Sequence, residues 1–303
     1  MKLRVLILGY GEMGHAMEYL LAERHDVRIW SLDGVKGRDS TLEDEVPWAQ
    51  MILFCLPVNP HHEIASRIAP FLANDSLCLT IAKGLDESGR TAAQVFESIF
   101  ANKHHYGVVY GPMISEEIRM GRHSFADAVL SDAADFEVMH SLFRGSTLVC
   151  QQASDMHGRS WSVIPKNVYA IIFGVADELK LGDNMRGHLM VAAIAELSGI
   201  VQSFGGQART PYSYAGLGDL LTTATSEDSH HHALGRQLVR GEWSDISGEG
   251  VHTLRMVEKY HLFDWRGYPL FALVRDIVTA PDTLNERVED YLKQLREVES
   301  CAI

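Results

Sequence analysis

The 303-residue sequence has little of what a membrane protein or a nucleic-acid-binding protein needs. No stretch approaches the ~18 consecutive apolar residues of a membrane-spanning helix. The apolar run at residues 5–8 is too short for the hydrophobic region of a signal peptide. Basic residues are outnumbered, with 27 Lys and Arg against 40 Asp and Glu and a net charge of −13. We therefore expect a cytoplasmic protein with no membrane insertion and no nucleic-acid partner.

Cysteine is scarce as well, and the four that occur lie far apart in the chain: Cys55, Cys78, Cys150 and Cys301. They form neither a CxxC pair nor a metal-ligand spacing, so we expect reduced thiols and no disulfide framework. Internal repeats, low-complexity tracts and long linkers are also absent. The hydrophobic content of 46% and the charged content of 22% are typical of a soluble globular protein. The length allows two ordinary domains with a sizeable core.

The two halves of the chain differ in their hydrophobic pattern. The first half alternates short apolar runs with helical segments such as 15–24, which is typical of a parallel sheet covered on both faces. We expect its strands at residues 4–9, 26–33, 50–57, 76–84, 106–112 and 125–132. From Trp161 onward helical periodicity prevails. The pattern predicts an α/β Rossmann-type dinucleotide-binding domain with a mainly parallel sheet (1–152), followed by an all-α substrate domain (153–303).

The first expected strand ends in a phosphate-binding fingerprint. The segment GYGEMG (9–14) is a GxGxxG between a strand and a helix, and its glycines are Gly9, Gly11 and Gly14. They permit a tight turn and a close approach of a pyrophosphate to the helix N-terminus. Asp33 follows Gly14 by 19 residues, the distance at which a carboxylate binds the ribose, although Asp is also a common turn residue. No arginine follows that strand directly, and Lys36 and Arg38 come later, so NAD is favoured over NADP.

Three polar residues are candidates for chemistry. Lys83 follows a buried strand, at the sheet edge where ligands bind in open α/β sheets. Lys166 begins the first long helix of the second domain, and Asp219 follows two glycines in AGLGDLLTT (215–223). A lysine can exchange protons near neutral pH if burial and a second cation lower its pKa. Asp219 would oppose that shift, and the sequence leaves the balance open.

With these residues aligned, the chain resembles the bacterial type of NAD(P)-dependent glycerol-3-phosphate dehydrogenase over nearly its whole length. The shared motifs are KGL (83–85), GPMISEE (111–117), KN (166–167), GDN.R (182–186), AGLGDLLTT (215–223) and EGV (249–251). The resemblance implies interconversion of dihydroxyacetone phosphate and sn-glycerol 3-phosphate, a role in phospholipid biosynthesis and carbohydrate metabolism, and a homodimer.

The resemblance also implies a role for individual residues. Lys166 would be the general acid/base at the C2 oxygen, Lys83 would polarise that oxygen, and Asp219 would bind the lysine and a substrate hydroxyl. The implied substrate-binding residues are Asn167, Thr223, Ser229, His230 and His231. The implied cofactor-binding residues are Gly9, Gly11, Glu12, Met13, Gly14, Asp33, Pro57, Lys83, Ser115, His230 and Glu249.

The chain departs from the family pattern where the substrate phosphate would bind. The family has SRN where this chain has Ser229, His230 and His231, and a family arginine on the second long helix is replaced by Ala192. The segment 113–115 also changes a wall near the nicotinamide, and Leu32 replaces an arginine after the second strand. Arginine offers a permanent charge and a bidentate fork to phosphate, which a histidine lacks.

The run of histidines at 230–232 has three interpretations. Its place after GLGDL favours contact with substrate or cofactor, but a solvated helix start is also open, since the chain has 15 histidines. A metal site is not expected, because adjacent residues on a helix point in different directions. The main functional prediction is the glycerol-3-phosphate reaction. The alternatives are the same chemistry on a 2-hydroxy acid or polyol, or an inactive dinucleotide-binding sensor.

Overall fold

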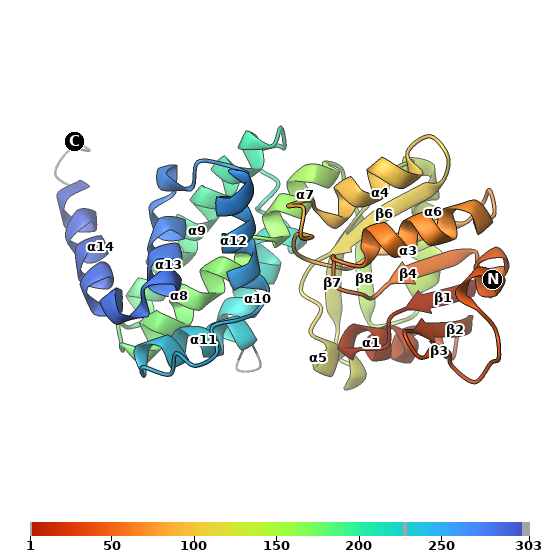
Figure 1. Ribbon diagram of the computed structural model, residues 1–303, viewed down its shortest axis with the longest axis horizontal. Coiled ribbons are helices and arrows are strands. Elements are labelled where there is room, and N and C mark those ends of the chain that lie inside the picture. Colours follow the sequence, from red (N-terminus) through yellow and green to blue (C-terminus); the bar gives the residue numbers. More distant parts are fainter. Residues whose placement is uncertain (1, 227–228, 299–303) are drawn as a thin grey trace.

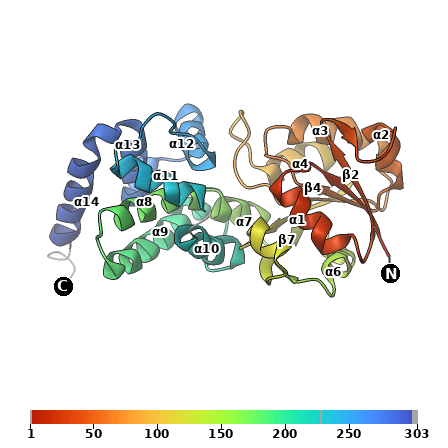
Figure 2. The ribbon, with the colours of Figure 1, turned by 90° about the horizontal axis from the view of Figure 1, so that it is seen from below.

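The computed structural model describes residues 2–226 and 229–298, so Cys301 lies outside the described residues. A sheet covered by helices lies beside a part made of helices, with helix α7 (Met156–Val163) at the junction (Figures 1 and 2). Helix α14 (Leu284–Val298) lies at the end farthest from the sheet (Figure 1). The α/β-then-α architecture predicted from the sequence is confirmed.

The sheet has eight strands in the order β3-β2-β1-β4-β5-β6-β7-β8. All neighbouring pairs are parallel except β2–β3 and β6–β7, so the prediction of a mainly parallel sheet is correct. The central strands are almost wholly apolar because helices cover both faces. The strands are β1 (Arg4–Leu8), β2 (Asp26–Ser31), β3 (Gly34–Val35), β4 (Met51–Phe54), β5 (Leu77–Thr80), β6 (His105–Tyr110), β7 (Ser124–Leu130) and β8 (Leu148–Gln152).

Two hydrophobic clusters attach the helices to the two faces of the sheet. One face packs against α1 (Glu12–Leu21), α5 (Ser115–Arg119) and α6 (Phe136–Phe143). The other packs against α2 (Leu42–Glu45), α3 (His61–Ile68) and α4 (Ala92–Phe100). This double covering leaves the carboxyl ends of the strands as the open edge of the sheet.

The helical part is built around α8 (Lys166–Glu178), which is buried from Lys166 through Ala176. It crosses α11 (His230–Val239) at Gly174 and Gly235, where a Cβ on either glycine would clash with the backbone of the other helix. The remaining helices surround it: α9 (Asp183–Ser203), α10 (Asp219–Thr225), α12 (Glu249–Tyr260) and α13 (Pro269–Thr279). Within 2–226 and 229–298, no helix is both long and apolar enough to cross a membrane.

Some element limits differ from the sequence prediction. The strand expected at 76–84 ends at Thr80, whose hydroxyl accepts the Ala82 N–H (3.0 Å) and turns the chain out of the sheet. The strand β8 was not predicted, because it is a short strand with polar, exposed residues at Gln151 and Gln152. The sheet ends at Gln152 and α7 begins at Met156; the domain limit at 152 stays a prediction.

Candidate active site

Two adjacent cavities lie at the open edge of the sheet. The first has a volume of about 410 Å³ and begins at the carboxyl ends of β1, β4 and β5. Ligands of open α/β sheets bind at this edge, where the strand order reverses, here between β1 and β4. The first cavity is lined by Gly11, Glu12, Met13, Cys55, Leu56, Pro57, Ile81, Ala82, Lys83, Met113 and Glu249.

The GxGxxG segment has the geometry of a pyrophosphate cradle. Gly9 has φ +98°, a conformation that favours glycine, and its amide donates to the Trp30 carbonyl (2.8 Å). A Cβ on Gly14 would clash with the Gly9 carbonyl, so this glycine is required for the close strand–helix contact. A Cβ on Gly11 would meet open space, at the N-terminus of α1. These residues therefore fit a dinucleotide, with the first-turn amides of α1 facing the phosphates.

The predicted ribose contact lies in the tight turn between β2 and β3. Asp33 is exposed there, and no described residue contacts its carboxylate. The cations that follow β2 are already engaged: Lys36 donates to Tyr10 (2.6 Å) and Glu18 (3.1 Å), and Arg38 lies 4.0 Å from Glu45. This end of the cradle offers one free carboxylate and no free cation among the described residues.

A buried polar cluster joins the two cavities. Lys83 Nζ donates to Asp219 Oδ2 (2.6 Å) and to the Gly111 carbonyl (2.9 Å). Lys166 Nζ lies 3.1 Å from Asp219 Oδ1 and donates to Thr223 Oγ1 (2.6 Å). Lys83 comes from the loop after β5, whereas the other members come from α8 and α10. The structure thus brings the three predicted catalytic residues together, with both lysines within hydrogen-bond distance of the Asp219 carboxylate.

The surroundings of Lys166 determine its pKa, which the sequence alone leaves open. Burial lowers its pKa, and the charge of Lys83 lowers it further, whereas Asp219 and Glu249 raise it. The net result is a pKa of about 8, well below the ordinary lysine value. Lys166 can therefore both donate and accept a proton near neutral pH.

The second cavity, of about 230 Å³, lies on the far side of this cluster and shares Lys83, Met113 and Glu249 with the first. All five predicted substrate-binding residues line it: Asn167, Thr223, Ser229, His230 and His231. Sequence reasoning missed the contributions of Glu116, Thr222 and Ser226; Glu116 belongs to the GPMISEE motif, which pointed to this wall. Asn167 donates to Glu249 Oε2 (3.0 Å), which links α8 to α12.

Four of the predicted cofactor-binding residues lie outside the lining of both cavities: Gly9, Gly14, Asp33 and Ser115. Ser115 is buried, and its hydroxyl contacts Glu116 (2.9 Å) and Glu12 (3.4 Å), so it supports the wall rather than forming it. Ala192, which replaces a family arginine, is partly buried against the helical core.

The three histidines have three different environments. His230 is exposed at the second cavity. The Nε2 of His231 accepts the Gly250 N–H (3.2 Å), so its proton lies on Nδ1. Burial lowers the pKa of His231 to about 4, and Lys166 and His230 add to the effect, so this ring is neutral.

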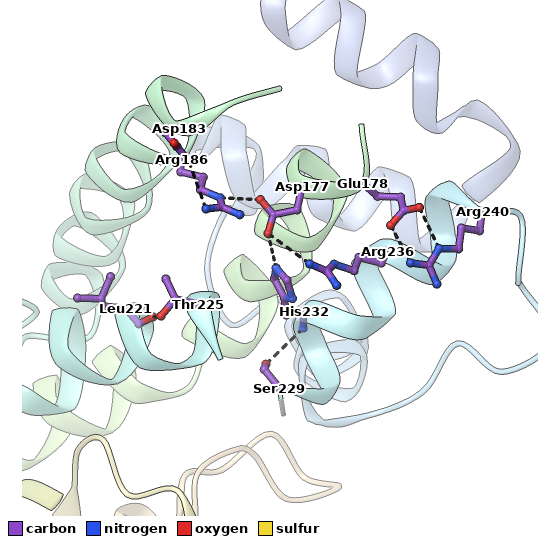
Figure 3. Close-up of polar contacts among 10 residues, drawn as sticks. All are labelled: Asp177, Glu178, Asp183, Arg186, Leu221, Thr225, Ser229, His232, Arg236 and Arg240. Carbon is purple, nitrogen blue, oxygen red and sulfur yellow. Dashed lines mark hydrogen bonds and ion pairs between the residues drawn. The ribbon is translucent and has the colours of Figure 1, made fainter. Parts of the chain in front are cut away.

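His232 lines neither cavity and points toward Asp177 of α8 (Figure 3). It is buried, and its Nε2 lies 2.7 Å from Asp177 Oδ2 on α8. No group of three or more His, Cys, Asp or Glu in the described part of the chain could hold a metal ion.

Comparison with known proteins agrees with this geometry. Residues 38–134 match the model of the NAD-dependent glycerol-3-phosphate dehydrogenase N-terminus, and residues 155–289 match that of the C-terminus. A glycerol-3-phosphate dehydrogenase [NAD(P)+] of Agrobacterium fabrum is 31% identical over 81% of this chain and 82% of its own. The corresponding protein of Acaryochloris marina is 28% identical over 98% and 97%.

Solved structures show the same fold. A glycerol-3-phosphate dehydrogenase from Coxiella burnetii superposes with a TM-score of 0.82 over 96% of this chain and 99% of its own, at 24% sequence identity. The family matches cover both the sheet part and the helical part, including the cluster of Lys83, Lys166 and Asp219. The chain therefore belongs to the NAD-dependent glycerol-3-phosphate dehydrogenase family.

Proposed function

We propose that the chain interconverts dihydroxyacetone phosphate and sn-glycerol 3-phosphate, with NAD as the hydride carrier and Lys166 as the general acid/base. The observation that carries the proposal is the buried cluster of Lys166, Asp219 and Lys83 where the two cavities meet. A dehydrogenase needs one group that exchanges a proton with the substrate oxygen beside the hydride path. Lys166 has the position and the lowered pKa for that task.

Each member of the cluster has a separate task in this proposal. When bound, the nicotinamide supplies or takes the hydride at C2. The Lys166 ammonium gives its proton to the C2 oxygen during reduction, and the neutral amine takes it back during oxidation. Lys83 donates a hydrogen bond to the same oxygen, and Asp219 holds both lysines in place.

For the cofactor we propose NAD rather than NADP. The carboxylate of Asp33 at the end of β2 would bind a ribose 2′-hydroxyl and repel a 2′-phosphate. Lys36 and Arg38 are the cations nearest in the chain that could bind a 2′-phosphate. They already contact Glu18 and Glu45, which also favours NAD.

The start of α11 is the proposed site of the substrate phosphate. Ser229, His230 and His231 line the second cavity at this helix N-terminus, where backbone amides favour anions.

One observation favours a second candidate, a substrate with an uncharged end. The only Lys or Arg side chains among the described lining residues of the second cavity are the two lysines bound to Asp219, and the carboxyl groups of Glu116 and Glu249 line the same cavity.

A substrate panel at fixed NADH separates these candidates. We expect NADH oxidation with dihydroxyacetone phosphate, and less with dihydroxyacetone and 2-oxo acids. Turnover of another ketone without turnover of dihydroxyacetone phosphate would favour the second candidate. NADH binding with no turnover across the panel would contradict both.

We further propose that the protein works as a homodimer in the cytoplasm. The family resemblance supports the dimer, and Val191 and Leu221, which are 72% and 50% exposed, are apolar side chains that a partner could cover. Light scattering after size-exclusion chromatography would give twice the monomer mass of 33.8 kDa. A monomer mass at micromolar concentration would contradict the dimer.

A further inference from the structure

We propose that His232 is a positioning residue: its pairing with Asp177 fixes the first turn of α11, which forms the substrate end of the second cavity (Figure 3). His232 contacts neither cavity itself. The inference concerns how the chain holds the substrate-binding turn, and its kinetic consequence rests on the function proposed above.

Asp177 is the centre of a partly buried polar network between three helices. It receives a hydrogen bond from His232 of α11 and one from Arg186 Nε of α9 (2.6 Å). Arg236 of α11 lies 4.0 Å away on the same carboxylate oxygen as His232. Burial raises the pKa of Asp177, but the hydrogen bonds from Arg186 and His232 outweigh it, so the net pKa is lowered and the carboxylate stays ionised. A hydrogen bond to such a charge holds its partner in one place.

The first turn of α11 carries His232 on the side that faces α8 and the cavity-lining residues on its other side. The Ser229 hydroxyl accepts the His232 N–H (3.3 Å) and so closes the first turn of α11. Ser229, His230 and His231 line the cavity, whereas the His232 ring lies against α8. Any shift of His232 therefore moves the residues that meet the substrate.

The first turn of α11 also contacts α12, whose Gly250 N–H donates to His231 Nε2 (3.2 Å), but its side-chain bond to α8 is the one made by His232. The close crossing with α8 positions the helix backbone, because Gly174 packs against the His232 carbonyl and Gly235 packs against the Ile171 carbonyl.

A second pair joins α8 to α11 at the other end, where Arg240 Nη2 donates to Glu178 Oε2 (2.8 Å). That pair is on the surface, with side chains 48% and 27% exposed, and lies one turn or more beyond the cavity. It is a matched control, because it links the same two helices without touching the first turn.

The test compares His232→Leu, His232→Gln and Arg240→Ala in the full-length protein. Leucine keeps the buried volume but loses the hydrogen bond, and the glutamine amide can restore a donor near the Nε2 position. We expect His232→Leu to raise the KM for dihydroxyacetone phosphate about tenfold, the size of one lost hydrogen bond to a charged group. The kcat and the KM for NADH should change less than about threefold, because the catalytic cluster does not include this residue. His232→Gln should recover most of the affinity, and Arg240→Ala should leave it unchanged.

Hydrogen exchange gives a readout that does not need turnover. We expect the amides of residues 229–233 to exchange at least about tenfold faster in His232→Leu than in the wild type, with α10 unchanged. Equal exchange in the two proteins would overturn the inference, whatever the substrate. An unchanged KM in folded His232→Leu, or an equal rise in Arg240→Ala, would overturn it too. A wild type without activity on dihydroxyacetone phosphate would instead contradict the proposed function, and exchange would still decide this inference.

Discussion

The Lys166 amine is buried, and two groups of opposite charge act on it within the cluster. Lys83 and burial lower its pKa, and Asp219 limits the fall, which places the pKa at about 8. Asp219 contacts both ammonium groups through different oxygens, so it orients the acid without neutralising it fully. This arrangement explains why a lysine, rather than a histidine, can serve as the acid/base here.

The pH dependence of the two reaction directions follows from that pKa. Reduction needs the Lys166 ammonium, so its rate should fall as the pH rises through about 8. Oxidation needs the neutral amine, so its rate should rise through the same pH. Initial rates between pH 6 and 10 in both directions, at saturating cofactor, check this. Two flat profiles, or two profiles that bend in the same direction, would exclude Lys166 as the acid/base.

Among the described residues that line the second cavity, the start of α11 carries no Lys or Arg, and one substitution can supply such a cation. His230 is exposed at the cavity, so His230→Arg would fit without repacking the core. A charge-assisted bond to the phosphate should lower the KM for dihydroxyacetone phosphate about tenfold. The KM for dihydroxyacetone, which has no phosphate, is the control and should stay the same. Equal changes for both ketones would show that this turn does not contact the phosphate.

At the scale of elements, the close packing of α8 against α11 depends on two glycines. Gly174 and Gly235 allow the two backbones to touch, and a Cβ on Gly174 would clash with the His232 carbonyl. We expect Gly174→Ala to lower the free energy of unfolding by about 1–3 kcal/mol, as overpacking does. Gly187→Ala on α9 is the control, because its Cβ meets open space. It should raise stability by up to ~1 kcal/mol through helix propensity.

Denaturant unfolding of both variants measures the difference. If Gly174→Ala were as stable as the wild type, the two helices would not be held at backbone contact. If Gly187→Ala were destabilised as well, the effect would not be specific to the crossing.

Sequence patterns predicted those features that depend on residues close together in the chain. The alternation of apolar strands with helices predicted the parallel sheet. The GxGxxG motif predicted the pyrophosphate cradle, because Gly9 and Gly14 lie within one turn of the chain. The resemblance to the family implied that Lys83, Lys166 and Asp219 act together. Contacts between distant residues were beyond that reasoning. The anchor of His232 is 55 residues away at Asp177, and no pattern in the histidine run distinguishes its third member.

The turn before Asp219 is a second example. Residues 214–218 form a π-helical turn, and Asp127 of β7 accepts the Ala215 N–H (3.0 Å) from 88 residues away. Arg159 and Gln151 also bind the Asp127 carboxylate, which is fully buried. The glycines in this segment indicated a close approach of the backbone, but not the carboxylate in the sheet that holds it.

At the scale of the whole molecule, the site needs both parts of the chain. The sheet part forms most of the first cavity and contributes Lys83, whereas the helical part contributes Lys166, Asp219 and the start of α11. Glu249 of α12 lines both cavities, as does Lys83, so each cavity is lined by both parts of the chain. In the proposed reaction the cofactor and the substrate would meet where the two parts join, beside Lys166.

The measurement that tests the account most directly is NADH oxidation with dihydroxyacetone phosphate by the wild type and by Lys166→Met. We predict turnover by the wild type and a kcat about 10²–10⁴-fold lower in the variant, the usual contribution of a general acid/base. NADH should bind both proteins equally, because Lys166 does not line the first cavity. A Lys166→Met protein that binds NADH and keeps the wild-type kcat would contradict the account.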